Sequence, residues 1–325
     1  MIKQANSGSK VTVIGSGNMG SAIAEVMAFN GLNVTMIDIE ERFLERGIQN
    51  IEKILNSQLK YMGGRSEKEI SRIESLGLTL NEDQKGIIRK KLAVEDPEAY
   101  SGNVMKRIHT STDYSEASKS EFVFEAVFEK LEIKKELFHK LSDILSENTI
   151  LASNTSSLSI TEISREYSRP ENTVIAHFFN PPYTLPLVEI VPGVLTSDST
   201  VERILNFIGG LKNHRTSMAP ILVKESPGFV VNRILVPMIN EAITLYGEGV
   251  ASKEDIDRAM KLGAGMPMGP LELADMVGLD ILLDVANDFV KDFGDQKYRA
   301  PYNLKRMVAG GKTGRKSGNG FYSYR

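Results

Sequence analysis

A glycine-rich turn constrains the fold of this chain more than any other segment. Residues 15–20 read Gly-Ser-Gly-Asn-Met-Gly and directly follow a β-branched run at residues 11–14. Residues 22–29 have a helical composition, Gly31 closes that helix, and a second apolar run occupies residues 34–37. A strand, a glycine turn, a helix and a second strand in this order predict a βα unit of a parallel sheet.

The glycine spacing in this context indicates a binding site for a dinucleotide, with a purely structural turn as the alternative. Gly15 permits the tight turn, Gly17 lets the backbone approach a pyrophosphate, and Gly20 allows close packing of helix on strand. The carboxylate of Asp38, at the end of the second strand, is expected to bind the adenosine ribose and repel a 2′-phosphate, which favours NAD over NADP. We expect cofactor contacts from Gly15, Ser16, Gly17, Asn18, Met19, Gly20 and Asp38.

Composition narrows the class of protein. A chain of 325 residues is long enough for two domains. The sequence contains no cysteine, which excludes disulfides, thiolate metal sites and a cysteine nucleophile, and we expect no metal site. The formal net charge of −3 gives no basic surface for nucleic acid, and no apolar run has the roughly 20 residues of a membrane span. We therefore expect a cytoplasmic protein that binds neither nucleic acid nor a membrane.

Charged residues with helical spacing interrupt the predicted sheet. They occupy residues 40–105 and suggest an inserted helical arm of two long helices, with an ordinary solvated helix pair as the alternative. The sheet then resumes and includes a closely spaced strand pair at residues 174–179 and 187–191. The predicted fold is an α/β Rossmann domain at residues 1–200 with an inserted helical arm, followed by an all-α C-terminal domain at residues 201–325.

The helix expected to start at Pro227 is apolar on more than one face. Proline is tolerated at the first position of a helix. A helix with several apolar faces is buried or lies at an interface. Ser252 followed by Asp255 resembles a capping box and predicts the start of another helix. The apolar seam that we predict for the first of these helices consists of Val231, Leu235, Met238, Ala242 and Leu245.

Among the four histidines, His177 has the most informative surroundings. His139 lies in a charged helical stretch, and His109 and His214 lie near the ends of elements without obvious partners. His177 lies within an apolar run, so its side chain is either a buried polar group or a functional one.

A carboxylate is expected directly opposite His177. If residues 174–179 and 187–191 form an antiparallel hairpin centred on Tyr183, His177 and Glu189 lie equally far from its centre and face each other. Histidine titrates near neutral pH and can accept the proton released when an alcohol is oxidised. A carboxylate on the other ring nitrogen fixes the tautomer and stabilises the imidazolium. A core histidine satisfied by the carboxylate is the alternative.

A polar cluster follows the strand expected at residues 150–152. It reads Ser-Asn-Thr-Ser-Ser at residues 153–157. In open α/β sheets, ligands bind beyond the carboxyl ends of the strands. These side chains therefore either place hydroxyls beside a reacting alcohol or cap the next helix.

Several ordered segments together resemble the short-chain L-3-hydroxyacyl-CoA dehydrogenases, a family that includes 3-hydroxybutyryl-CoA dehydrogenases. The resemblance covers nearly the whole chain and implies reversible, NAD-dependent oxidation of an (S)-3-hydroxyacyl-CoA to the 3-ketoacyl-CoA. The segments are VIGSGNMGSAIA at 13–24, FEAVFEKLEIKKELF at 124–138, SNTSSLSI at 153–160, HFFNPP at 177–182, LVEIVPG at 187–193, ESPGFVVNRIL at 225–235, ASKEDIDRAMKLGAGMPMGPLEL at 251–273, VGLD at 277–280 and GRKSGNGFYSY at 314–324.

The resemblance also implies roles for individual residues. His177 would be the general base with Glu189 as its partner, while Ser156 and Asn232 would contact the reacting oxygen of the substrate. The arm would help to bind CoA, and Lys60 is our choice of contact there. The helical second domain would form a homodimer interface. Further cofactor contacts implied by the resemblance are Glu129, Lys134, Asn154, Ser156, Asn180 and Lys316.

One segment departs from the family pattern. Between His177 and Glu189 the chain reads FFNPPYTLPLV, whereas many short-chain hydroxyacyl-CoA enzymes carry Met-Lys before Leu-Val. The Pro-Pro-Tyr form is similar to relatives that act on free hydroxy acids, such as gulonate and carnitine dehydrogenases. A dehydrogenase of a free 3-hydroxy acid is therefore the alternative enzyme. An NAD-binding sensor or structural protein is the alternative without catalysis.

Overall fold

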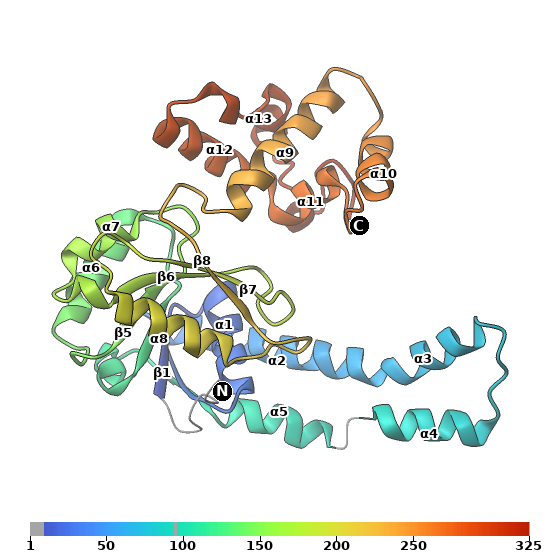
Figure 1. The fold of residues 1–325 in the computed structure, drawn as a ribbon, viewed down its shortest axis with the longest axis horizontal. Helices are drawn as coiled ribbons and strands as arrows, with labels where there is room; N and C mark the ends of the chain where they lie inside the picture. The colour runs from blue at the N-terminus through green and yellow to red at the C-terminus, as the bar shows by residue number, and fades with distance from the viewer. Residues whose placement is uncertain (1–9, 94–95, 325) are drawn as a thin grey trace. The chain divides into compact units, whose positions relative to one another are not determined.

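The computed structural model describes residues 10–93 and 96–324 and divides the chain into two compact units (Figure 1). The first unit contains the described residues up to Thr155 together with Ile160–Val223. The second unit contains Ser156–Ser159 and the chain from Lys224 onward. The short segment Ser156–Ser159 is therefore separated in sequence from the rest of its unit.

One sheet organises the first unit. Within the described residues it contains eight strands in the order β3-β2-β1-β4-β5-β6-β7-β8. All neighbouring strands are parallel except β6 and β7, which are antiparallel. This parallel core confirms the predicted fold class of the unit. The strands are β1 (Lys10–Ile14), β2 (Asn33–Ile37), β3 (Ile108–Ser111), β4 (Phe122–Glu125), β5 (Ile150–Ser153), β6 (Thr173–Phe178), β7 (Leu187–Val191) and β8 (Ala219–Leu222).

Strand β3 was not predicted from the sequence. It reads Ile-His-Thr-Ser, and a segment this short with one large apolar residue carries no periodic signal. It forms one edge of the sheet by pairing with β2. His109 is consequently an exposed residue of an edge strand.

An apolar core joins alternate residues of the strands to the helices that cover one face of the sheet. Phe122 and Phe124 of β4 pack in this core with Met27 of α1 and Phe207 of α8. The rings of Phe122 and Phe207 are stacked with their centroids 4.0 Å apart. Burial of each such side chain contributes about 1.5–3 kcal/mol. The helical elements near the sheet, including α1 and α8, are α1 (Asn18–Phe29), η1 (Tyr114–Lys119), α6 (Leu131–Ser142), α7 (Ile160–Ile163), η2 (Ser164–Glu166), η3 (Pro170–Asn172) and α8 (Asp198–Gly209).

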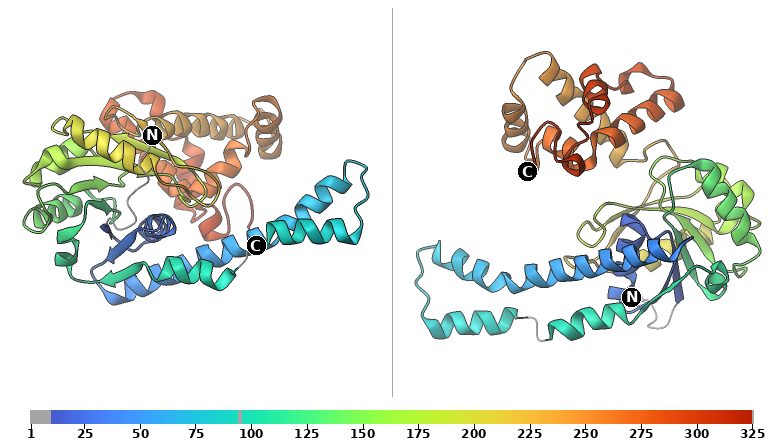
Figure 2. Two further views of the ribbon diagram at one scale, coloured as in Figure 1. Left: turned by 60° about the horizontal axis from the view of Figure 1, so that its bottom comes forward. Right: turned by 180° about the vertical axis from the view of Figure 1, so that it is seen from behind.

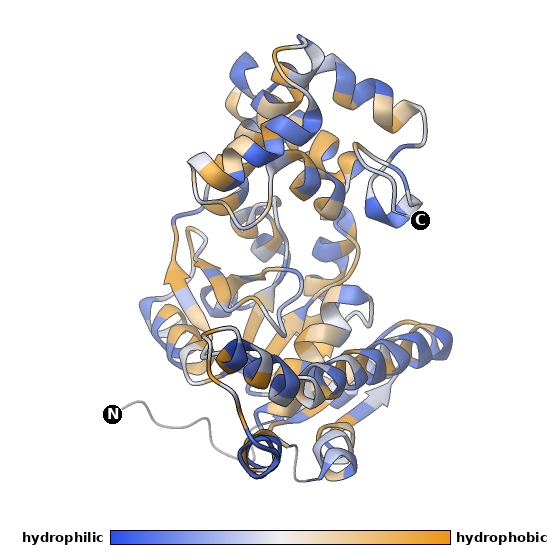
Figure 3. Ribbon diagram, turned by 90° about the vertical axis from the view of Figure 1, so that its right-hand side faces the viewer, coloured by the Kyte–Doolittle hydropathy of each residue, from blue (hydrophilic) through white to orange (hydrophobic). Residues whose placement is uncertain are grey.

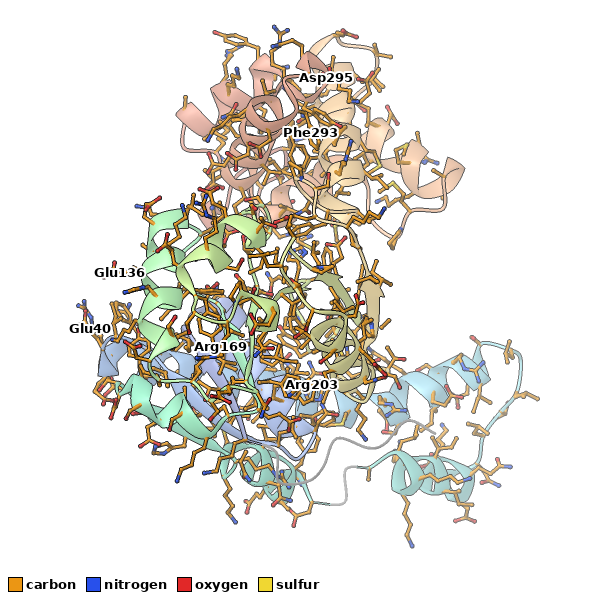
Figure 4. All side chains as sticks on the ribbon, turned by 60° about the vertical axis from the view of Figure 1, so that its left-hand side comes forward. Glu40, Glu136, Arg169, Arg203, Phe293 and Asp295 are labelled. Carbon is orange, nitrogen blue, oxygen red and sulfur yellow. The ribbon has the colours of Figure 1, made fainter. Side chains whose placement is uncertain are left out.

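Arg169 holds the carboxyl end of α6. Its Nη2 donates to the backbone carbonyls of Ser142 and Leu145, each at 3.0 Å. The side chain of Arg169 is labelled in Figure 4. The carbonyl of Ser142, the last residue of α6, has no partner within the helix, so the guanidinium caps it and also holds the turn that follows. Glu136 lies on the exposed side of the same helix.

The first unit extends beyond residue 200, where the sequence placed its end. Helix α8 and strand β8 belong to this unit. Strand β8 pairs in parallel with β7, and Ile204 and Phe207 of α8 join the core of the sheet. The predicted boundary was too early because β8 is a short edge strand whose mostly exposed residues show no alternating pattern.

Four helices form the arm where the sequence predicted two. Figure 2 shows one pair leading away from the sheet and the other pair returning beside it. Gly64 separates the two helices of the outgoing pair, and Asn81 caps the first helix of the returning pair with a full capping box. The helices are α2 (Glu41–Gly63), α3 (Arg65–Glu74), α4 (Glu82–Leu92) and α5 (Pro97–Met105).

The arm is packed at its base and held by charges further out. Leu44, Ile51 and Leu55 of α2 join the core of the sheet, whereas α4 buries no residue. Figure 3 shows the corresponding change from apolar strands to largely hydrophilic arm helices. Two interhelical ion pairs, Lys85–Glu74 at 2.9 Å and Arg89–Glu67 at 2.7 Å, join α3 to α4. Each exposed ion pair contributes only about 0–1 kcal/mol, so the contacts at the base determine where the arm is held.

The second unit is helical, as predicted. Its core contains Leu271, Phe289 and Leu304 from three different helices. Among the described residues, none of the helices combines the length and the apolar character that crossing a membrane requires. The helical elements are α9 (Val231–Gly247), α10 (Lys253–Gly263), α11 (Pro270–Val277), α12 (Leu279–Phe293), η4 (Gln296–Tyr298), α13 (Tyr302–Ala309) and η5 (Arg315–Ser317).

One prediction about α9 was wrong. The helix begins at Val231 rather than at Pro227, because Gly228 and Phe229 adopt positive φ values of 70° and 49° that interrupt it. Leu235 and Leu245 of the predicted seam pack, partly buried, against the core of the unit, whereas Ile234 is 67% exposed. The buried residues are Val236, Ile239, Asn240, Ala242 and Ile243, of which only Ala242 belongs to the predicted seam. The capping of α10 by Ser252, whose Oγ accepts from the N–H of Asp255, is confirmed.

Candidate active site

The glycine turn allows β1, α1 and the end of β4 to approach closely. Gly15 has a φ of +98°, and a Cβ there would lie 2.5 Å from the carbonyl oxygen of Ala126. A Cβ on Gly20 would lie 1.7 Å from the carbonyl oxygen of Gly15. Both positions therefore require glycine on steric grounds.

The same turn offers a surface that fits the phosphates of a dinucleotide. A Cβ on Gly17 would meet no atom within 4 Å, and both Gly17 and Asn18 are exposed. Gly17 is the N-cap of α1, and no side chain caps the helix there. The first N–H groups of α1 and the positive end of its dipole therefore favour an anion at this turn.

Asp38 lies beside this turn at the end of β2. Its Oδ2 accepts hydrogen bonds from the backbone N–H and the Oγ of Ser16, at 2.7 and 2.6 Å. Its Oδ1 accepts from the N–H of Ile39 at 2.7 Å. A carboxylate has about four acceptor sites, so Asp38 retains capacity for ribose hydroxyls while it holds the turn.

His177 and Glu189 face each other across β6 and β7. They are opposed in the antiparallel register, which confirms the pairing predicted from their spacing around Tyr183. Nδ1 of His177 lies 2.8 Å from Oε2 of Glu189. The two side chains are only 7% and 0% exposed. The carboxylate is therefore a desolvated partner whose interaction with a charged imidazole is stronger than it would be in water.

This pairing assigns the proton positions on the imidazole. A carboxylate only accepts hydrogen bonds, so Nδ1 carries the donated proton and Nε2 is the basic nitrogen of the neutral ring. When Nε2 accepts a proton, Glu189 compensates the new charge. The ring of Phe179 lies 4.6 Å from the imidazole between centroids and restricts its rotation. The arrangement suits general acid–base chemistry.

Asn154 supports the backbone next to His177. Its Oδ1 accepts from the N–H of Phe178 at 2.9 Å. Its own N–H donates to the carbonyl oxygen of Glu125 at 2.8 Å. Asn154, which directly follows β5, thus connects the carboxyl end of β4 through its backbone to that of β6 through its side chain.

A buried carboxylate beside this site was missed in the sequence. Glu125, the last residue of β4, is fully buried and accepts from Lys134 Nζ at 2.6 Å and from Ser153 Oγ at 2.5 Å. It also accepts from the N–H of Val127 at 2.7 Å. A glutamate at the end of the apolar run Phe-Val-Phe was a visible signal, because a buried charge needs a partner.

Family models cover almost the whole of the described chain. The model described as "3-hydroxyacyl-CoA dehydrogenase, NAD binding domain" matches residues 10–96 and 78–225, and the model described as "3-hydroxyacyl-CoA dehydrogenase, C-terminal domain" matches residues 228–324. The chain belongs to the 3-hydroxyacyl-CoA dehydrogenase family. Membership confirms NAD as the cofactor and an NAD-dependent 3-hydroxyacyl-CoA dehydrogenase as the class of enzyme.

Similar proteins match over nearly their full length. A 3-hydroxybutyryl-CoA dehydrogenase of Clostridioides difficile is 38% identical over 97% of this chain and 99% of the relative. The mitochondrial hydroxyacyl-coenzyme A dehydrogenase of Homo sapiens is 38% identical over 97% of this chain and 91% of the relative. The crystal structure of an (S)-3-hydroxybutyryl-CoA dehydrogenase from Ralstonia eutropha superposes with a TM-score of 0.80, at 39% identity and over 97% and 99% of the two chains.

In this dehydrogenase, Lys134 lies within a buried ion-pair network. Its Nζ contacts Glu125 at 2.6 Å and Glu129 at 3.3 Å, and the side chain is 1% exposed. Burial by itself would lower the pKa of Lys134, but the two carboxylates raise it above its ordinary value, so the ammonium stays charged. Glu129 in turn accepts from Oγ1 of Thr155 at 2.5 Å. The network orients Glu129, and a direct contact of Lys134 with the cofactor stays a prediction.

The other predicted site residues of the dehydrogenase are distributed over both units. Ser156 and Asn232 belong to the second unit, and Asn232 lies in the first turn of α9. Lys316, in the same unit, pairs with Asp280, and this pair lowers the pKa of Asp280 although burial opposes the shift. Asn180 is an exposed residue after β6, and Lys60 is an exposed residue of α2. The roles of these five residues stay predictions.

Proposed function

We propose that His177 is the general base with which this enzyme oxidises (S)-3-hydroxyacyl-CoA to 3-ketoacyl-CoA. The observation that carries the proposal is the buried 2.8 Å contact between His177 Nδ1 and Glu189 Oε2. When bound, NAD accepts the hydride from carbon 3. Nε2 of His177 accepts the hydroxyl proton, and Glu189 stabilises the imidazolium. In the reverse direction His177 returns the proton to the oxygen.

Ser156 and Asn232 are the groups that we propose for holding the reacting oxygen. A hydroxyl and an amide can each donate a hydrogen bond to an alcohol or ketone oxygen. Asn232 is a partly exposed amide in the first turn of α9, which suits a role in contacting a polar ligand. Family resemblance at PGFVVN and SNTSS supports the assignment.

The arm is proposed to bind the CoA portion of the substrate, with Lys60 as a contact. Its exposed, charged surface suits recognition of a large polar group. The experiment is the consumption of NADH with acetoacetyl-CoA and, separately, with free acetoacetate. We expect turnover with the thioester and little with the free acid. Efficient turnover of the free acid alone would favour the alternative, a free hydroxy-acid dehydrogenase.

We also propose a homodimer formed through the second unit and a cytoplasmic location. Apolar side chains on the outside of α9 and α12 support the dimer, since Ile234 is 67% and Ile281 is 48% exposed. Equilibrium sedimentation at micromolar concentration tests it, and a monomer would contradict it.

A further inference from the structure

A turn at residues 212–217 contacts α1, two helices of the arm and the loop between β6 and β7. We call it the bracing turn. It is closed by an antiparallel bridge between Lys212 and Ser217. The Oδ1 of the buried Asn213 accepts from the N–H groups of Arg215 and Thr216, at 2.9 and 3.0 Å. The bracing turn therefore holds its own conformation.

His214, at the centre of the bracing turn, joins α1, the helix that follows the glycine turn, to the arm. Its Nε2 lies 2.8 Å from Oε1 of Glu25 on α1, and its Nδ1 lies 2.7 Å from the hydroxyl of Tyr100 on α5. The side chains of His214 and Glu25 are 4% and 0% exposed. The sequence suggested no partner for His214, because Glu25 and Tyr100 are distant in the chain.

The orientation of these hydrogen bonds follows from burial. Burial raises the pKa of Tyr100, and the Glu25 carboxylate raises it further, so the hydroxyl keeps its proton. In the neutral imidazole whose Nε2–H donates to the Glu25 carboxylate, Nδ1 is the acceptor, and the Tyr100 hydroxyl donates to it. Among the described atoms, Oε2 of Glu25 has no hydrogen-bond partner, which makes His214 essential for satisfying this buried carboxylate.

The bracing turn also contacts α2, a second helix of the arm, and the loop between β6 and β7. The guanidinium of Arg215 lies 5.6 Å from the ring centre of Tyr61 on α2. Nδ2 of Asn213 donates to the carbonyl oxygen of Pro182 at 3.2 Å, and the N–H of His214 donates to that of Tyr183 at 3.2 Å. Pro182 and Tyr183 lie in the loop that joins the strands of His177 and Glu189.

We propose that His214 is a positioning residue for the acyl-CoA substrate, because the bracing turn fixes the arm relative to the loop that joins the catalytic strands. The CoA portion held by the arm and the reacting carbon held near His177 are then kept at a set separation. A substrate without the CoA portion does not need this separation. The inference rests on the proposed binding of CoA by the arm.

The test compares two substrates in three variants of the full-length enzyme. Acetoacetyl-CoA carries the whole CoA portion, whereas acetoacetyl-N-acetylcysteamine keeps the thioester but lacks the nucleotide. The variants are His214→Gln, Tyr100→Phe, which removes only one hydroxyl, and His139→Gln, a matched control on the exposed side of α6. Amide hydrogen exchange of the arm helices provides an independent measurement.

We expect His214→Gln to raise KM for acetoacetyl-CoA about tenfold, with kcat and KM for the truncated thioester and for NADH almost unchanged, because preorganisation of the arm is lost. Tyr100→Phe should give a smaller change of the same kind, and exchange should accelerate in α5. If His214→Gln does not fold, the result for Tyr100→Phe decides.

Equal changes in KM for both thioesters, or no change for either, would overturn the proposal. If the wild-type enzyme has the same KM for both thioesters, the proposed binding of CoA by the arm is wrong, and this inference is wrong with it. A wild-type preference for CoA that is unaffected by both variants would overturn this inference alone.

Discussion

Nδ1 of His177 and Oε2 of Glu189 lie 2.8 Å apart at opposed positions of β6 and β7, an antiparallel pair in an otherwise parallel sheet over the described residues. An antiparallel pair places the two side chains directly opposite each other on one face. The strand pairing thus places the imidazole and the carboxylate within hydrogen-bonding distance of each other.

Replacing the proposed base should abolish most of the activity. We expect His177→Gln to lower kcat about 100-fold or more, because glutamine cannot accept the substrate proton. The measurement is steady-state NADH oxidation with acetoacetyl-CoA. His139→Gln removes a histidine from an exposed position and should retain full activity. Unchanged turnover in His177→Gln would show that another group takes the proton.

Neutralising the partner of the base should also reduce the rate. Glu189→Gln keeps the shape of the side chain but removes the charge that stabilises the imidazolium, and we expect kcat to fall about 10²–10⁴-fold. The pH–rate profile should shift as well. Glu136→Gln, on the exposed side of α6, is the matched control. Equal rates for the two variants would contradict a catalytic role of the pair.

The carboxylate of Asp38 is expected to determine the choice of cofactor. Asp38→Asn keeps one acceptor oxygen, which can still hold Ser16, but removes the charge that repels a 2′-phosphate. The preference of the wild type for NAD, measured as the ratio of kcat/KM values, should decrease about tenfold or more in this variant. A wild-type enzyme equally efficient with NAD and NADP would contradict this explanation.

The buried pair of Glu125 and Lys134 should show strong energetic coupling. Lys134→Met leaves the Glu125 carboxylate buried without its closest cation, so we expect a loss of about 3–5 kcal/mol in the free energy of unfolding. The double variant Glu125→Gln, Lys134→Met removes both charges and should recover part of that loss. Urea denaturation of the two single variants and the double variant measures the coupling. Additive losses would be evidence against it.

Tyr100 should contribute to the loss of stability at alkaline pH. Burial and the nearby Glu25 raise its pKa above the value of about 10 in an unfolded chain. The folded state therefore binds this proton more tightly, and the stability it provides is complete below pH about 10 and is lost as the pH rises through the folded pKa. The unfolding free energy of the wild type should fall more steeply above pH about 10 than that of Tyr100→Phe. Parallel urea-denaturation profiles would refute this.

The features that were predicted correctly from the sequence are those that short stretches of sequence specify. The turn at residues 15–20 was recognisable because steric limits at Gly15 and Gly20 act between neighbouring elements. The pairing of His177 with Glu189 was predictable because one short loop joins their strands and side chains alternate with a period of two.

The sequence left open the choice between alternative packing surfaces. The sequence of α9 offers several apolar faces, and only packing against the rest of its unit decided that Val236 and Ile239 are buried while Ile234 is exposed. Likewise, β8 became part of the first unit because β7 provided hydrogen-bonding partners at the sheet edge.

Steric and periodic rules that act over a few residues were enough to predict the parallel sheet, the dinucleotide turn, the helical second unit and the opposed His177 and Glu189. Which distant groups share a buried position became known from the packed fold. Glu125 with Lys134, and His214 with Glu25 and Tyr100, meet because a buried charge must find a partner, and the packed fold alone determines which partner is within reach.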